Sequence, residues 1–228
     1  MLVESVDAPA GIELGQCNLK ACDKRLKALC TEMERRLVPW DVVAIVDPPK
    51  SLPWWHSELR DYHIWYDTGD TEIDEAHNPR AIPSRKAKNE PKPKLFRIAG
   101  IAFLIRKKIA VGRWAATLLQ SSGLGGNVAT LSVTTAADDS LRIHAVYNRN
   151  TEIDLDELAE HCMGDSDILL GDFNLAARLW ARDGKSDPLG EKLARLINQH
   201  NMVCLNKPGV LTYSRSKDTT KNSSVIDL

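Results

Sequence analysis

The chain has 228 residues, with 30 Lys and Arg against 31 Asp and Glu and a formal net charge of -1. Hydrophobic residues make up 43% of the sequence, which is enough to bury a core in one large domain or in one domain with an insertion. The balanced charge excludes a globally basic nucleic-acid arm and a strongly acidic disordered tail, so a charged partner must be met by a local patch. From the length and the hydrophobic fraction, we expect a single domain over residues 1–228.

Cysteine usage and the N-terminal sequence indicate the compartment. The five cysteines are thinly spread and form no CxxC pair, which argues against a disulfide framework and against a zinc knuckle. The first ten residues contain Glu4 and Asp7 but no apolar signal region, and no apolar run approaches the roughly 18 residues of a membrane span. We expect an intracellular protein with reduced thiols and no membrane partner.

The first elements of the chain are predicted to be strand, helix and strand. Residues 12–19 alternate in polarity, and apolar residues in 26–37 then recur at helical spacing until Pro39 interrupts the pattern. Residues 42–46 form a short β-branched apolar run that is typical of a buried strand.

A long segment without periodicity follows at about 48–94, and we interpret it as an irregular insertion. Its charges are segregated, because residues 57–79 hold seven acids and one Arg, whereas residues 80–108 hold ten Lys and Arg and one Glu. The segment is either a solvated loop or a basic flap that meets a phosphate backbone.

The remaining sequence alternates strand and helix patterns. The cluster Gly123, Gly125 and Gly126 lacks the GxGxxG spacing and predicts a hairpin turn within 121–127. Strands are predicted at 98–105, 128–134, 141–147, 167–173 and around Val203, Leu211 and Val225, with helices at 152–162 and 188–199. The interleaving indicates an α/β (α+β) fold of stacked sheets covered by helices.

The segment that carries most chemistry is Ile-Leu-Leu-Gly-Asp-Phe-Asn at residues 168–174. Side chains two apart on a strand share a face, so Asp172 and Asn174 point the same way from the end of this strand. An Asp that accepts a proton beside a positioning amide suits activation of water on a phosphodiester. The same residue types also fit a strand that simply ends in a turn.

Other apolar strands end in polar residues, in a particular order along the chain. These residues are Gln16 and Asn18, then Asp47, then Tyr147 and Asn148, and finally Ser224 and Asp227. The order, with GDFN and SSVIDL and the segments GIAFLIRKKI and LRIHAVYN, resembles the endonuclease/exonuclease/phosphatase superfamily. Within it, the sequence is similar to the apurinic-endonuclease-like endonuclease domain of non-LTR retrotransposons of fungal and arthropod type, over about residues 12–228.

The resemblance implies two packed β-sheets flanked by helices, a four-layer α/β/β/α sandwich with its last strand or strands missing. It also implies hydrolytic nicking of DNA with Mg²⁺ or Mn²⁺, a reverse transcriptase domain as a partner in a parent polypeptide, and a nuclear location. The convergent acids and amides include no balancing Lys or Arg, which also favours a divalent cation.

Each site residue receives a role from the resemblance. Asp172 would orient or deprotonate the water with Asn174 fixing its geometry, Asn18 and Asp47 would serve the metal, Tyr147 would contact the phosphate, Asp227 would orient a His, and Asn148 and Ser224 would bind substrate.

Three departures from the family pattern predict weak or absent activity. Asp47 stands where the family usually has Glu, and the shorter side chain could displace the metal by about 1 Å. Ala176 and Ala177 replace a His pair, and the chain stops at Leu228, before the family's Ser-Asp-His element. Of the six His residues, His144 is interpreted as a satisfied core residue rather than a replacement catalyst.

Two alternatives to a DNA-nicking enzyme remain open. One is a catalytically inactive remnant or nucleic-acid-binding module, which the three departures favour. The other is a small-molecule or lipid phosphoesterase of the same superfamily, which would share the metal site.

Overall fold

The computed structural model describes residues 6–8, 12–20, 23–48, 59–66, 100–135, 138–148, 153–181, 186–205, 213–214 and 223–224. Its strands are β1 (Val6–Ala8), β2 (Ile12–Asn18), β3 (Val42–Val46), β4 (Tyr62–Tyr66), β5 (Ile101–Arg106), β6 (Trp114–Leu118), β7 (Val128–Thr134), β8 (Ser140–Tyr147), β9 (Asp167–Asp172), β10 (Tyr213–Ser214) and β11 (Ser223–Ser224). The α-helices are α1 (Asp23–Arg35), α2 (Leu155–Cys162) and α3 (Pro188–Gln199). None of the helices in these residues is long and apolar enough to cross a membrane.

The first sheet has five strands in the order β1-β2-β3-β5-β4, in which β2 and β3 are parallel and the other neighbours antiparallel. Every residue of β3 is buried, as expected for an apolar strand that is covered on both faces. On the outer face, Leu26, Leu29 and Met33 of α1 pack against the sheet, because their spacing places them on one side of the helix.

The second sheet has four strands in the order β6-β7-β8-β9, in which only β8 and β9 are parallel. Helices α2 and α3 cover its outer face, and Leu158, Leu193 and Ile197 belong to the core beneath them. Both helices begin with an Asp whose side chain accepts backbone N–H groups, Asp154 in α2 and Asp187 in α3, which satisfies donors that a helix start leaves without partners.

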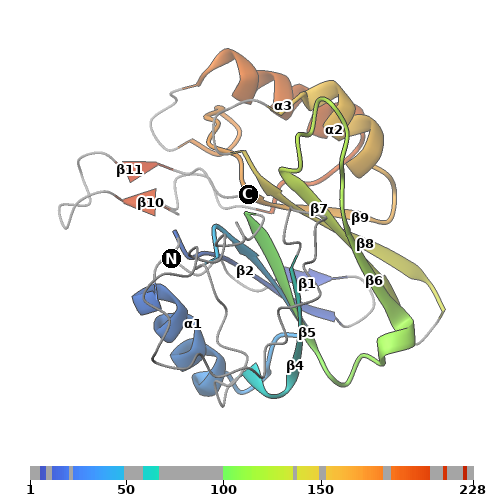
Figure 1. Ribbon diagram of the computed structural model, residues 1–228. Helices are drawn as coiled ribbons and strands as arrows, with labels where there is room; N and C mark the ends of the chain where they lie inside the picture. Colours follow the sequence, from blue (N-terminus) through green and yellow to red (C-terminus); the bar gives the residue numbers. More distant parts are fainter. Residues whose placement is uncertain are drawn as a thin grey trace, which may run out of the picture.

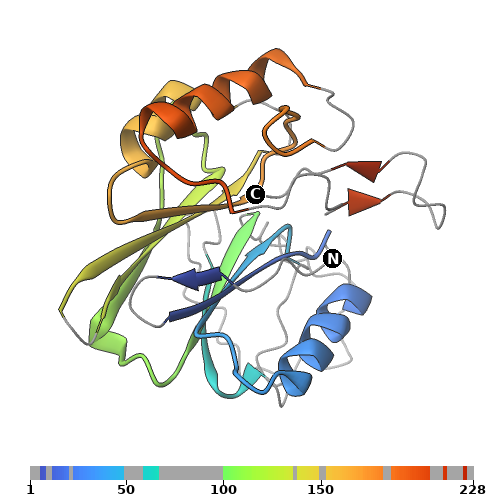
Figure 2. The ribbon, with the colours of Figure 1, turned by 180° about the vertical axis from the view of Figure 1, so that it is seen from behind.

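The two sheets pack face to face and form a second core between them. Phe103 and Ile105 of β5 meet Leu131 of β7 and Ile143 of β8 in this core. Figures 1 and 2 show α1 on one outer side, α2 and α3 on the other, and the sheets between them. The expected α/β sandwich of two sheets flanked by helices is confirmed.

Three strands depart from the sequence-based expectations, and the first of them, β1, was not predicted. The expectation of irregular structure throughout 48–94 is wrong for 62–66, which form edge strand β4 against β5. Its residues are mostly half-buried, so they show no clear period of two. Strand β6 escaped prediction for a similar reason, because its residues alternate only between exposed and half-buried.

The C-terminal expectations are met in part. Val203 lies outside any strand and is 79% exposed. Leu211 and Val225 lie outside the described residues, although the short strands β10 and β11 pair antiparallel close to both positions in sequence. The predicted turn within 121–127 is present and connects β6 to β7.

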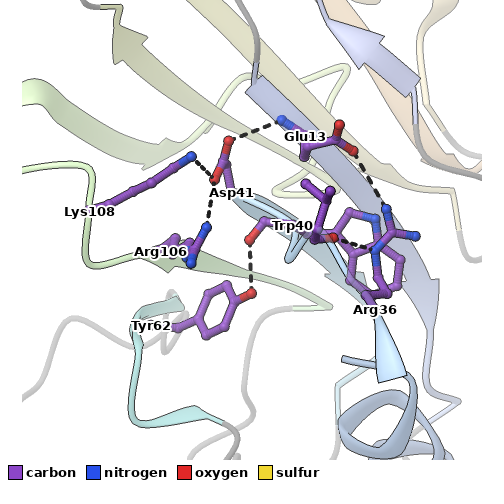
Figure 3. A network of polar contacts seen from close by, with 8 residues as sticks. Glu13, Arg36, Trp40, Asp41, Tyr62, Arg106 and Lys108 are labelled. Atoms are coloured by element: carbon purple, nitrogen blue, oxygen red, sulfur yellow. Dashed lines mark hydrogen bonds and ion pairs between the residues drawn. The ribbon is translucent and has the colours of Figure 1, made fainter. Parts of the chain in front are cut away.

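A buried carboxylate holds together the end of the first sheet where β3 begins (Figure 3). Asp41 is 1% exposed and accepts the backbone N–H of Glu13 at 3.1 Å. Lys108 Nζ and Arg106 Nη1 lie 2.6 and 3.7 Å from Asp41 Oδ1. This part of the basic segment 80–108 is therefore at the far end of β5 from Gly100. Residues 80–99, the rest of the expected basic flap, lie outside the described residues.

Candidate active site

Parallel pairing brings several predicted site residues to the same edge of the sandwich. Asn18 ends β2 and Asp47 follows β3, and these two strands are parallel neighbours in the first sheet. Tyr147 ends β8 and Asp172 ends β9, which are parallel neighbours in the second sheet. Because parallel strands end on the same side of a sheet, each pair delivers its polar residues to one edge.

A hydrogen bond joins the two sheets at this edge. Asn18 Nδ2 donates to Asp172 Oδ2 at 2.6 Å, and the two residues are 6% and 3% exposed. The other end of the amide, Asn18 Oδ1, accepts the backbone N–H of Lys20 at 3.0 Å, as in an Asx turn. The amide of Asn18 is thus oriented by the chain that follows it and holds Asp172 in place.

Burial and hydrogen bonding act in opposite directions on Asp172. Burial raises the pKa of its carboxyl from 3.8 to about 6, and the negative charge of Asp47 adds to the rise. The backbone N–H of Asn174, which donates to Oδ1 at 3.2 Å, the positive charge of Lys20 and the amide of Asn18 favour the ionised form and limit the pKa rise. A carboxylate with a pKa near neutrality is suited to accept a proton from water.

Asn174 and Asn148 connect the loops that follow β9 and β8 through hydrogen bonds. Asn174 has a φ of 51°, which Asn tolerates better than most residues, and its Nδ2 donates to the backbone oxygen of Asn148 at 3.0 Å. Asn148 Nδ2 donates to the backbone oxygen of Phe173 at 2.9 Å, while its Oδ1 accepts the N–H of Ile153. At 2% exposure, Asn148 is placed to shape the loops around Asp172. Its predicted contact with substrate stays a prediction.

The glycine of the GDFN segment, Gly171, is required for steric reasons. Gly171 has a φ of 139°, and a side chain there would overlap the backbone oxygen of Val146 and stand 2.7 Å from its nitrogen. A Cβ atom cannot be accommodated at these separations. Glycine at position 171 therefore allows β9 to approach β8 closely, and this approach positions Asp172.

Asp47 and Tyr147 both contact Gly100. The backbone N–H of Asp47 donates to the oxygen of Gly100 at 2.7 Å, and the ring of Tyr147 lies against Gly100 on the side where a side chain would be. Asp47 is half-buried with a φ of 48°, so its carboxylate sits on a sharp turn just after β3.

Lys20 is a site residue that sequence reasoning missed. Its positive charge offsets part of the rise that burial causes in the pKa of Asp172, so the expectation that no cation accompanies the acids is wrong. Its position two residues after Asn18, in the turn that leaves β2, is the signal that could have identified it, because polar residues just beyond a strand end share its edge.

The remaining predicted residues are placed as follows. Asp227 lies outside the described residues, and Ser224 is described only as part of β11. Ala177 is 0% exposed, and Ala176 contributes backbone contacts to Asp187. Ala177 therefore belongs to the packed interior beneath α3, whereas the half-buried Ala176 contacts the residue that begins that helix.

His144 is a buried core residue, as predicted. It is 1% exposed, its Nδ1 lies 2.8 Å from Thr130 Oγ1, and its Nε2 lies 3.2 Å from Asp167 Oδ1. Burial lowers the pKa of His144 and outweighs the nearby Asp167 carboxylate, which raises it. The imidazole is therefore neutral at physiological pH.

The oxygen atoms at this edge fit a hard divalent cation. The described residues contain no group of three or more His, Cys, Asp or Glu side chains that could hold a metal. They do contain two mutually repelling carboxylates, Asp47 and Asp172, and the amide oxygen of Asn18, which keeps a second lone pair. Oxygen donors of this kind suit Mg²⁺ or Mn²⁺, which retain several waters and need few protein ligands.

The two-sheet α/β sandwich, with Asp and Asn residues at its parallel strand ends, agrees with the fold that the sequence resemblance implies. Residues 141–228 match the sequence model of the endonuclease-reverse transcriptase family. The structure is similar to the endonuclease domain of TRAS1, a telomere-specific non-LTR retrotransposon, with a TM-score of 0.60 and 15% identity over 94% of this chain and 82% of the other. No curated protein matches the sequence.

These matches confirm the resemblance that the motifs predicted. Residues 141–228 are similar to the endonuclease-reverse transcriptase family, and the fold is similar to that of a non-LTR retrotransposon endonuclease domain. At 15% identity the structural likeness shows the fold alone, so the reaction, the metal and the substrate are matters for proposal.

Proposed function

We propose that this domain is a metal-dependent phosphodiesterase that nicks DNA. The observation that carries the proposal is the hydrogen bond from Asn18 to Asp172, which brings the polar ends of β2 and β9 together although they belong to different sheets. Burial of the Asp172 carboxylate, whose pKa is near 6, lowers the stability of the fold. Buried groups with shifted pKa values are typical of functional sites.

The contacts of each side chain support the role proposed for it. Asp172 accepts a proton from the attacking water or orients it, and Asn18 and the N–H of Asn174 hold its two oxygens in fixed directions. Tyr147, seated on Gly100, contacts the phosphate, and Lys20 adds positive charge to an otherwise acidic site. The predicted roles of Asp227 and Ser224 as a positioning and a substrate-binding residue stay predictions.

Asp47, Asn18 and Asp172 are the residues that would bind the cation. A bound Mg²⁺ or Mn²⁺ would supply positive charge that stabilises negative charge developing on the phosphate. The carboxylate of Asp47 has no hydrogen-bond partner among the described residues, which leaves its oxygens available for this purpose.

DNA as substrate and a reverse transcriptase in the parent polypeptide are part of the proposal. They are supported by the description of the matching family as endonuclease-reverse transcriptase. A nuclear location would follow from such a partner.

A plasmid-nicking assay tests the proposal. In Mg²⁺ the parent protein should convert supercoiled plasmid to the open circle, although slowly, because Asp47 is shorter than the Glu usual in the family, and chelation of the metal should stop the reaction. Asp172→Asn should lower the rate by about 10³-fold or more, because the base is lost, whereas Asp165→Asn, which neutralises an exposed acid, should leave it unchanged. Equal rates for these two variants would contradict the role of Asp172, and faster hydrolysis of a small phosphodiester than of plasmid would favour the small-molecule alternative.

A further inference from the structure

Gly100 connects one predicted site residue from each sheet. It directly precedes β5 in the first sheet and lies at the site end of that strand, because Ile101 pairs with Val46, the last residue of β3. Its oxygen accepts the backbone N–H of Asp47 at 2.7 Å. Its Cα faces the ring of Tyr147, which ends β8 in the second sheet.

The requirement for glycine at this position is one of space. A Cβ atom at Gly100 would overlap Tyr147 Cδ1, stand 3.1 Å from Cε1 and lie 3.5 Å from Cγ. The residue is not among the glycines with positive φ, which are Gly125, Gly126 and Gly171. Its backbone conformation is therefore open to any residue, and the contact with the tyrosine ring is what excludes a side chain.

We propose that Gly100 is a positioning residue, whose missing side chain forms the seat of the Tyr147 ring. The inference rests on the proposed function, in which Tyr147 contacts the phosphate. A methyl group at this seat moves the ring away from the first sheet, while the backbone hydrogen bond that locates Asp47 stays in place. Gly100 thus sets the distance between the phosphate contact of one sheet and the carboxylate of the other.

The test compares Gly100→Ala with Gly112→Ala. Gly112 lies in the exposed turn after β5, at the other end of that strand, and an added Cβ there meets no atom within 4 Å. Gly100→Ala should lower kcat/KM for nicking by about 10²-fold, as expected for a displacement of about 1 Å in a reacting group, whereas Gly112→Ala should have no effect. Divalent-cation affinity should be the same in both variants, because Asp47 is held through the backbone of residue 100.

A double-mutant cycle with Tyr147→Ala separates positioning from general destabilisation. Without the ring there is nothing to displace, so Gly100→Ala should cost no further activity in the Tyr147→Ala background. If Gly100→Ala lowers the melting temperature or the yield of folded protein, removal of the ring should restore it. Multiplicative losses in the cycle, or a melting temperature that the second substitution does not restore, would overturn the inference.

A spectroscopic measurement makes the test independent of catalysis. In protein labelled with 3-fluorotyrosine, the ¹⁹F resonance that disappears in Tyr147→Phe belongs to Tyr147. This resonance should shift in Gly100→Ala and stay in place in Gly112→Ala. An unmoved resonance would refute the seat. A shifted resonance in a protein that nicks no DNA would support the seat and contradict the proposed function.

Discussion

Asn18 and Asp172 are 154 residues apart in the sequence, and their side chains are joined by a hydrogen bond of 2.6 Å. The bond crosses from the first sheet to the second, and its donor is itself oriented by the backbone N–H of Lys20. The sandwich and the candidate site therefore depend on each other, because a change in the packing of the two sheets would move the proposed base away from its support.

The raised pKa of Asp172 predicts a specific dependence of stability on pH. Between pH 3.8 and about 6 the folded protein keeps a proton that the unfolded chain has lost, so the ionisation of Asp172 destabilises the fold progressively as the pH rises through this window. In metal-free buffer, Asp172→Asn should therefore gain stability relative to the parent as the pH rises from about 4 to 7, by on the order of 2–3 kcal/mol. Urea unfolding at several pH values measures this difference, and a constant gap between the two proteins would show that the pKa is not raised.

The proposed cation site predicts a metal-dependent melting temperature. Mg²⁺ or Mn²⁺ should raise the melting temperature of the parent protein, because a ligand that binds only the folded state stabilises it. Asp47→Asn should abolish the gain. Asn is preferable to Ala in this test, since residue 47 has a φ of 48° and Asn tolerates that conformation. Glu160→Gln, which removes an exposed acid of α2, is the control and should keep the full gain. A parent protein without any metal-dependent shift would exclude the site.

The ion pair between Arg142 and Asp167 predicts a large effect on stability away from the candidate site. Arg142 Nε and Nη2 lie 2.6 and 2.7 Å from the two oxygens of Asp167, whose side chain is 0% exposed. Arg142→Ala should lower the free energy of unfolding by about 3 kcal/mol, because it leaves a buried charge without its main counter-charge.

Arg195→Ala provides the matched control for this prediction. Arg195 is an exposed residue of α3, so its loss should change the free energy of unfolding by less than about 0.5 kcal/mol. Similar values for the two variants in urea unfolding would mean that solvent, rather than Arg142, compensates the charge of Asp167.

The sequence by itself determined those features that depend on neighbouring residues. The buried strand at 42–46, the helix at 188–199 and the strand that ends in GDFN follow from local periodicity and from residues that favour strand ends. The alternation of strand side chains did not decide where Asn174 points, because Asn174 follows the end of β9 and has a φ of 51°. The order of such strand ends along the chain was sufficient to predict the fold class and the family resemblance.

Only the tertiary structure decided how the strand ends meet. No local pattern shows that Asn18 donates to Asp172 rather than to water, that the charge of Lys20 acts on the same carboxylate, or that Gly100 seats Tyr147. Strands β4 and β6 were missed for the same reason, since their half-buried residues gain order from pairing with β5 and β7. Local sequence periodicity does not predict the packing of two sheets, the burial of a charge or the contact of a ring with the backbone. Each of these depends on residues that are far apart in the chain.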